Sequence, residues 1–496
     1  MNDSLLHQQQ PQHSQQTQQE HHRAHDSHAV QASPAPLSHH QASEASSLYD
    51  TEVEQLTRFR RDLHRIPELG FELPKTIAYV THTLEDVREI LLSNYGAAAC
   101  TVFSPCKSTV CAFFNRESEY TTAIRSDMDA LPVTETTMLP FASQHDGQMH
   151  ACGHDGHMSM VLGLARWLAA HFEELPRNVL LVFQPAEETT GGARVVCESG
   201  VFERYNVDRI FGFHLWPDLP AGQIASRPGA LLAAANEVTA TFHGKSSHIA
   251  KADDGADALE ACMRFYQDAY AYIAQREKEE PCLLKFGHME AGTVRNAIAG
   301  HAVLEGSLRT FSVEMGKRCR HELSELAQKH AKEMGCICEL YFSEGYPPVV
   351  NDARLYEMTL EALTESGMEQ GQMPTRENAV ETQAQSDATQ EKAPLNKNIT
   401  EIKLASNTSE NAPDTSFSVH EALPALPNPA PLLAPTELPE PLLIAEDFAF
   451  YQQHLPGVFL LLGTGTGIPL HADTFNFDES ILQQGLNAYK ALVMMK

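Results

Sequence analysis

The stretch Tyr120-Thr-Thr-Ala-Ile-Arg-Ser-Asp-Met-Asp-Ala-Leu-Pro132 joins a short apolar run to a group of charged side chains. Its first part, Tyr120–Ile124, predicts a buried strand, and Asp127 and Asp129 follow closely. Open α/β sheets place their functional sites at the carboxyl ends of their strands. This stretch therefore predicts both a class of fold and a position for the site.

Two further apolar runs lead into polar side chains in the same way. Val179–Phe183 is followed by Gln184-Pro-Ala-Glu187-Glu188, and Ile210–Phe213 runs into His214. A fourth apolar run, Val458–Leu462, also predicts a strand, and Met158–Phe172 and Leu355–Leu363 have helical periodicity. Apolar strands that alternate with helices predict an α/β domain whose largely parallel sheet is covered on both faces.

Residues 232–347 have a different pattern. A polar strand over Glu237–Phe242 is followed by a helix over Ala256–Arg276, further strand-like runs, and a second helix over Val313–Met334. The pattern predicts an α+β insert with a small sheet of its own.

Length and composition narrow the class of protein. The chain of 496 residues predicts two to three domains. Its formal net charge of −29 disfavours nucleic acid and anionic membrane as partners. We expect no membrane span and no secretory signal, and ten cysteines without a tight repeated spacing indicate reduced thiols. These features predict a cytoplasmic protein.

Two segments have biased composition. Residues 1–48 are rich in Gln, His, Ser and Ala, and we interpret them as a disordered tail because a His-rich tract without a hydrophobic pattern cannot fold a rigid metal site. Residues 368–441 are predicted to be a low-complexity insertion. The remaining chain divides into catalytic-domain segments at 49–231, 348–367 and 442–496, interrupted by the insert at 232–347.

The densest group of ligand-type residues is His150-Ala-Cys152-Gly-His154-Asp155-Gly-His157. Thiolate, imidazole and carboxylate so close together favour a site for a borderline-soft divalent ion. The alternative is a polar turn that caps the following helix, and for His157 itself a structural role is favoured.

The adjacent Glu187 and Glu188 suggest two different roles in one site. One carboxylate can bind a metal ion while the other accepts a proton from water, whose pKa the ion lowers. The alternative is a solvated surface pair, which the preceding apolar strand disfavours. Histidines flanked by apolar residues, as His214 and His471 are, more often lie in the core with their hydrogen bonds formed than bind a metal ion. Taken alone, neither residue is therefore predicted to be a ligand.

Nine motifs together resemble the M20 metallopeptidases, in particular their amidohydrolase branch of hippurate hydrolases, N-acyl-amino-acid hydrolases and hydrolases of auxin (indole-acetic acid) conjugates. The resemblance covers the chain from about residue 52 onward, except for the insertion. In order, the motifs are Arg61–Gly70, Asp127–Pro132, Met149–His157, Gln184–Glu188, Gly212–His214, His243–His248, Ala291–Asn296, Ala445–Phe448 and Leu470-His471.

The resemblance implies a two-domain α/β fold, with a zinc-peptidase-like catalytic domain and a ferredoxin-like α+β insert that serves as lid and dimerisation domain. It implies two divalent metal ions per chain, Zn²⁺ or Mn²⁺ with Ni²⁺ or Co²⁺ as alternatives. Glu187 corresponds to the general base and Asp129 to a carboxylate that orients the site, whereas Asp127 is not assigned as a ligand. The implied metal ligands are Cys152, His154, Glu188, His214 and His471.

Three lid residues are also implied to act in the site. His248 corresponds to a histidine that stabilises the oxyanion of the reaction, and Asn296 and Arg309 to positions that hold the polar end of the substrate. A guanidinium suits a carboxylate because it can donate two parallel hydrogen bonds. The alternative for Arg309 is an ion pair on the surface of a strand.

The expected function is therefore metal-dependent hydrolysis of the amide bond of small N-acyl amino acids, with a homodimer formed through the lid. A dipeptidase or carboxypeptidase of the same family is the first alternative. The second is a catalytically silent relative used for binding, which the presence of the base and of every implied ligand disfavours.

Overall fold

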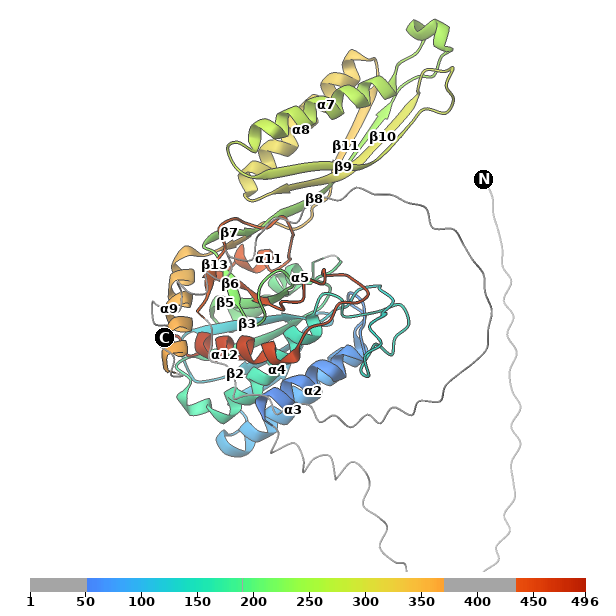
Figure 1. The fold of residues 1–496 in the computed structure, drawn as a ribbon. Helices are drawn as coiled ribbons and strands as arrows, with labels where there is room; N and C mark the ends of the chain where they lie inside the picture. Colours follow the sequence, from blue (N-terminus) through green and yellow to red (C-terminus); the bar gives the residue numbers. More distant parts are fainter. Residues whose placement is uncertain (1–50, 190, 370–433) are drawn as a thin grey trace, which may run out of the picture. The chain divides into compact units, whose positions relative to one another are not determined.

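The computed structural model describes residues 51–189, 191–369 and 434–496. Its larger sheet is mixed and has eight strands (Figure 1). The strand order is β1-β2-β4-β3-β5-β14-β6-β13. The strands are β1 (Cys100–Phe103), β2 (Val110–Phe114), β3 (Thr121–Asp127), β4 (Asn178–Gln184), β5 (Val207–Trp216), β6 (Ile224–Ser226), β13 (Thr436–Glu437) and β14 (Gly457–Gly463). The central strands β4, β3, β5 and β14 are parallel, as predicted. β1 pairs with β2, β2 with β4, and β6 with β14 in antiparallel fashion.

Helices cover both faces of this sheet, which confirms the predicted α/β class. Along β4, the side chains of Leu181 and Phe183 join one buried cluster, and those of Leu180 and Val182 join the other. The first cluster includes residues of α2 (Glu52–His64), α3 (Pro74–Tyr95), α4 (His154–Ala170), α9 (Ala353–Glu369) and α12 (Leu482–Val493). The second includes residues of α5 (Gly192–Glu198), α6 (Val201–Arg204) and α11 (Ala449–Gln452). Burial on both faces explains why the middle of β4, Val179–Phe183, is a continuous apolar run.

The start of α4 depends on a glycine. Gly153 has φ of 87°, and a Cβ atom there would lie 2.8 Å from Cδ1 of Leu215 on β5. Glycine alone adopts this backbone without strain and allows the close approach. The first turn of α4 therefore packs directly against the end of β5, beside His214.

The insert forms the predicted separate sheet. Its elements are β8 (Ala234–His243), α7 (Ala258–Arg276), β9 (Cys282–Ala291), β10 (His301–Thr310), α8 (Val313–Glu333) and β11 (Ile337–Phe342). The strand order β11-β8-β10-β9, with every pair antiparallel, is the ferredoxin-like arrangement. Apolar side chains of α7, α8 and one sheet face form a core of their own.

Two short strands join the insert to the rest of the chain. β7 (Gly229–Leu232) precedes the insert and β12 (Val349–Asn351) follows it, and the two pair with each other. Three 3₁₀ turns complete the described elements, at Phe172–Glu174, Ile249–Asp254 and Glu479–Ile481.

The structure corrects one boundary. Thr436 and Glu437 were predicted to belong to the insertion, but they form β13, because they add in parallel to the free edge of β6. The predicted tail and the insertion up to residue 433 lie outside the described residues. All ten cysteines lie within the described residues and are free. Among the described helices, none has the length and apolar character needed to cross a membrane.

Candidate metal centre and active site

The carboxyl ends of three central strands bring the predicted site residues together. Asp127 is the last residue of β3, the loop after β4 carries Glu187 and Glu188, and His214 lies near the end of β5. The predicted site therefore forms where parallel strands of an open sheet end.

Five side chains from this region and its neighbours form one cluster. The Cys152 Sγ atom lies 3.3 Å from Nε2 of His214, and Nε2 of His471 lies 3.4 Å from Oε1 of Glu188. His154 Nε2 is 3.8 Å from the same oxygen of Glu188. Cys152 belongs both to a group with His154 and His214 and to a group with Glu188 and His471, in each of which the possible ligand atoms lie within 4.8 Å of one another.

Two of the histidines are oriented as metal ligands usually are. Nδ1 of His154 lies 2.7 Å from the carbonyl oxygen of Asp129, and Nδ1 of His214 lies 2.7 Å from that of Leu215. A proton on each Nδ1 is donated to these carbonyls, so each Nε2 presents a lone pair to the cluster. Burial lowers the pKa of both imidazoles, that of His214 to about 3, which keeps them neutral.

The cluster leaves two buried ligand atoms without a hydrogen bond inside the described chain. Nε2 of His154 and Oε1 of Glu188 are buried and form no hydrogen bond with the described residues. Burial and the charges of Glu188 and Glu187 raise the pKa of the Cys152 thiol, so a thiolate there requires a cation beside it. Sulfur, nitrogen and carboxylate donors around one point fit divalent metal ions.

The adjacent carboxyls of Glu187 and Glu188 have opposite properties. Burial, with the charges of Glu446 and Glu188, raises the pKa of Glu187 well above its usual range. Burial alone would also raise the pKa of Glu188, but the facing His471 and His154 lower it to about 2. Neighbouring acids whose pKa values are driven apart are suited to different roles, one exchanging protons and one remaining charged.

Asp129 holds the backbone of this pair. Its Oδ1 accepts the N–H of Glu187 at 2.9 Å, and its Oδ2 accepts the N–H of Glu188 at 3.1 Å. The residue before the pair, Ala186, has a φ of 58°, which is uncommon for a non-glycine residue and typical of functional sites.

Asp127 lies in a buried network beneath the cluster. Its carboxylate accepts hydrogen bonds from Nη1 of Arg125 at 2.6 Å and from Nδ1 of His157 at 2.7 Å. Nε2 of His157 accepts the N–H of Leu215 at 2.9 Å, and so holds the backbone next to His214. His157 thus has the structural environment that the sequence favoured.

Two sets of contacts around Glu187 were not identified from the sequence. Arg125 also donates to Glu446 and Asp447, at 2.9 and 2.8 Å, and so neutralises carboxylates next to Glu187. The hydroxyl of Tyr346 donates to the carbonyl oxygen of Glu187 at 2.5 Å. The sequence contains no signal for the second contact, because only the fold brings these two residues together.

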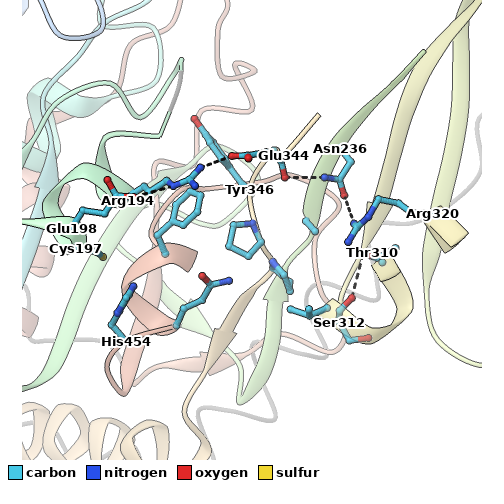
Figure 2. A pocket seen from close by; sticks show the side chains of 18 residues that line it. Arg194, Cys197, Glu198, Asn236, Thr310, Ser312, Arg320, Glu344, Tyr346 and His454 are labelled. Atoms are coloured by element: carbon cyan, nitrogen blue, oxygen red, sulfur yellow. Dashed lines mark hydrogen bonds and ion pairs between the residues drawn. The ribbon is translucent and has the colours of Figure 1, made fainter. Parts of the chain in front are cut away.

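A cavity of about 790 Å³ opens over the cluster. Its wall includes Arg309 of the lid and the apolar residues Leu443, Ile444 and Leu470. A second cavity of about 400 Å³ lies beside it and shares the side chains of Arg194, Glu344 and Tyr346 (Figure 2).

The other two predicted lid residues do not line the cavity over the cluster. His248 is exposed, and its Nδ1 accepts the N–H of Ala250 at 3.2 Å. Asn296 is its neighbour, since the carbonyl oxygen of Asn296 accepts the N–H of Ile249. His248 follows the end of β8 that is distant from Ala235, the residue that pairs with Tyr346, and Asn296 lies in the neighbouring loop between β9 and β10. Ten residues of strand, Ala234–His243, span roughly 30 Å at about 3.3 Å per residue.

Comparisons with known proteins show the family to which the chain belongs. Residues 123–425 match the model of peptidase family M20/M25/M40. An uncharacterised hydrolase of Staphylococcus epidermidis is 31% identical over 455 residues, which cover 89% of this chain and 98% of the relative. An N-acetyldiaminopimelate deacetylase of Streptococcus uberis is 30% identical over 445 residues, with 88% and 98% covered.

Solved structures show the same fold. A Bacillus subtilis protein described as a dinuclear metal-binding peptidase of the M20 family superposes with a TM-score of 0.63 at 27% identity, covering 89% of this chain and 97% of its own. A Staphylococcus aureus protein described as an aminohydrolase has the fold at a TM-score of 0.70 and 24% identity, with 90% of this chain and 97% of its own covered. The chain therefore belongs to peptidase family M20 and is an amide-bond hydrolase of the metal-dependent type.

Proposed function

We propose that the protein hydrolyses the amide bond of N-acyl amino acids, with Glu187 as its general base. The observation that carries this proposal is the position of Glu187 beside Glu188 in a cluster of possible metal ligands. A buried carboxyl with a raised pKa lies next to a charged carboxylate within one cluster of thiol, imidazole and carboxylate groups. That combination suits hydrolysis by activated water.

The proposed metal ligands are Cys152, His154, Glu188, His214 and His471, with the thiolate of Cys152 shared between two ions. When bound, divalent ions polarise a carbonyl oxygen and lower the pKa of water. Thiolate and imidazole favour Zn²⁺, and Mn²⁺, Ni²⁺ and Co²⁺ remain alternatives. The unpartnered Nε2 of His154 and Oε1 of Glu188 support the assignment.

Glu187 would accept a proton from the attacking water and later return it to the leaving nitrogen. Its raised pKa supports the return of the proton, and divalent ions bound beside it would lower that pKa so that the carboxylate could first accept the proton. Asp129 fixes the position of this carboxyl through the backbone. His248 would add a hydrogen bond to the oxyanion that develops on the substrate.

Arg309 would bind the carboxylate of the amino acid. Its guanidinium has no hydrogen-bond partner among the described residues, and it lines the same cavity as Glu187 and Cys152. Its charged neighbour is Glu237, also on the cavity wall. Asn296, which lies beside His248 and outside this cavity, would hold the same polar end of the substrate only if it reached the cavity together with His248. Leu443 and Ile444 offer apolar surface for the acyl group.

N-acetyl diamino acids are a second substrate class. Relatives from Streptococcus uberis and Shouchella clausii are named N-acetyldiaminopimelate deacetylases. The cavity wall of this chain carries both cations and anions, with Arg194 and Arg309 near Glu237 and Glu344. A substrate with a distant ammonium and carboxylate could use both charges.

We also infer that two copies pair through the lid. β9 and β11 are edge strands of the lid sheet, and Ile337 and Tyr341 of β11 are 68% and 63% exposed. Unpaired edges with apolar side chains favour pairing with another chain. The ten free thiols favour a reducing compartment, the cytoplasm.

The test combines metal analysis of the purified protein with a hydrolysis screen. The substrates are N-acetyl, N-benzoyl and indole-acyl amino acids, N-acetyl diamino acids and plain dipeptides. We expect about two ions per chain and cleavage of acyl amino acids but not of dipeptides. Preference for dipeptides would favour the peptidase, and bound metal without turnover of any substrate would favour the silent relative.

A further inference from the structure

Tyr346 connects the chain that leaves the lid to the general base of the proposed reaction. It lies between β11 and β12, and its hydroxyl donates to the carbonyl oxygen of Glu187 at 2.5 Å. Burial and the nearby carboxylates of Asp447 and Glu187 raise the pKa of this phenol. It therefore stays protonated and able to donate.

The backbone of Glu187 is held on both sides. Its N–H donates to Oδ1 of Asp129 at 2.9 Å, and its carbonyl oxygen accepts from Tyr346. With both flanking peptide groups fixed, the Cα atom of Glu187 has little freedom to rotate. Because Ala186 already adopts a positive φ of 58°, the loop holds an uncommon conformation that these contacts stabilise.

Tyr346 lies in the segment that leaves the lid, and its backbone is hydrogen-bonded to the segment that enters the lid. It exchanges two backbone hydrogen bonds with Ala235 at the start of β8, at 3.0 and 3.1 Å. A Cβ atom on the preceding Gly345 would lie 1.6 Å from the carbonyl oxygen of Ala235, so only glycine permits this approach.

Side chains next to Tyr346 hold the same segment. The Asn236 amide donates to the carbonyl oxygens of Ser343 and Glu344, at 2.9 and 3.0 Å, and its own oxygen accepts from Arg320 of α8. The carboxylate of Glu344 pairs with Arg194 of α5 (Figure 2). The position of the Tyr346 hydroxyl therefore depends on how the lid strands are joined to the catalytic domain.

We propose that Tyr346 is a positioning residue for Glu187, and that it makes the placement of the base depend on the lid connection formed by Ala235, Asn236 and residues 343–346. The inference rests on the proposed role of Glu187. A ring that only filled space against Phe450, whose centroid is 6.1 Å away, would do so equally well without its hydroxyl.

The test removes only the hydroxyl group of Tyr346. Tyr346→Phe should lower kcat about tenfold or more, because a small displacement of a catalytic group is costly, with KM changed less than about twofold. Metal content and thermal stability should stay near wild type. The matched control is Tyr356→Phe, since Tyr356 is a buried tyrosine whose hydroxyl donates to the carbonyl oxygen of Ser226 at 3.4 Å, away from the cluster. Its kcat should be unchanged.

A double-mutant cycle tests the dependence on the lid connection. Asn236→Ala should lower kcat in the wild-type background but have little further effect when Tyr346→Phe is present, because both changes act through the same contact. Equal effects in both backgrounds would overturn this part of the inference.

The remaining outcomes are distinct. Wild-type kcat in Tyr346→Phe, or a loss of kcat that follows lost metal or lowered stability, would overturn the positioning role. Absence of turnover of every acyl amino acid by the wild-type protein would instead overturn the proposed function.

Discussion

Asp129 holds Glu187 through the backbone and not through the side chain. Its two carboxylate oxygens accept the N–H groups of Glu187 and of the following Glu188, at 2.9 and 3.1 Å. One carboxylate thus fixes both the proposed base and a proposed ligand. Its own backbone carbonyl also accepts from Nδ1 of His154, at 2.7 Å.

Asp129→Asn should therefore impair the site at two points. The amide keeps one acceptor oxygen but turns an N–H donor towards the second backbone N–H, which leaves that group unpaired. We expect kcat to fall about 10- to 100-fold. We also expect the affinity for the metal ion that Glu188 binds to fall more than the affinity for the other ion. Steady-state kinetics and metal titration would measure both effects, with Asp208→Asn, near the surface, as the control.

Glu187→Gln removes the proton acceptor but keeps the shape of the side chain. Since Glu188 and not Glu187 is the proposed ligand, metal content should stay near wild type while turnover falls by about 10²-fold or more. Metal analysis and kinetics on the same preparation would show this, and exposed Glu203→Gln should change neither. Retained turnover would mean that another group is the base.

The sequence predicted the catalytic half of the molecule well, for a physical reason. Buried parallel strands are continuous apolar runs, and ligand-type residues at their ends stand out against them, as at Asp127, Glu187 and His214. The strands continue further than their apolar parts: β3 extends to Asp127 and β4 to Gln184, because ladder hydrogen bonds do not depend on side-chain polarity.

Other contacts could not be predicted, because they depend on where distant segments meet. Tyr346 and Glu187 are joined by a hydroxyl and a carbonyl group, and neither has a local sequence pattern. Glu446 and Asp447 were recognised only as part of a family motif, whereas their neutralisation by Arg125 follows from the packing of the loop before α11 against β3. β13 was missed because a strand of two residues has no periodicity.

Arg309 is proposed to bind the carboxylate of the substrate, so its removal should affect binding selectively. Arg309→Met should raise KM about tenfold or more for N-acyl amino acids, because a charge-assisted pair is lost. The same change should have little effect on the corresponding N-acyl amino acid amides. Arg318→Met is the control, since Arg318 lies on exposed α8 and pairs with Glu279. An equal change for acids and amides would contradict the assignment.

If His248 acts in the site as proposed, it must reach the cavity either by movement of its own lid or from the lid of a second copy. The two routes differ in a mixing experiment with His248→Ala and Glu187→Gln, each of which should be nearly inactive alone. If the lid of one chain serves the site of the other, mixed dimers regain turnover, because one of their two sites has both groups intact. If each lid serves its own chain, mixing restores nothing. Size-exclusion chromatography and an activity assay of the mixture decide between them.

The buried His64 should make stability depend on pH in the alkaline range. Its Nδ1 lies 2.8 Å from Asp155 and its Nε2 lies 3.3 Å from Glu135, with Arg60 and His150 as further neighbours. Burial by itself lowers the pKa of an imidazole, but the hydrogen bond and charge of Asp155, with Glu135, raise that of His64 to about 9.

A folded-state pKa above the unfolded value of 6.5 means that the native state binds the proton more tightly. The contribution of this proton to the free energy of unfolding is fully present below pH 6.5 and is lost as the pH rises through about 9. A shift of this size corresponds to a contribution on the order of 3 kcal/mol. Urea unfolding at pH 6 and at pH 10 should therefore show that His64→Asn costs more stability at the lower pH. Exposed His82→Asn should show no such difference, and a cost for His64→Asn that is the same at both pH values would mean that His64 is neutral in the native protein.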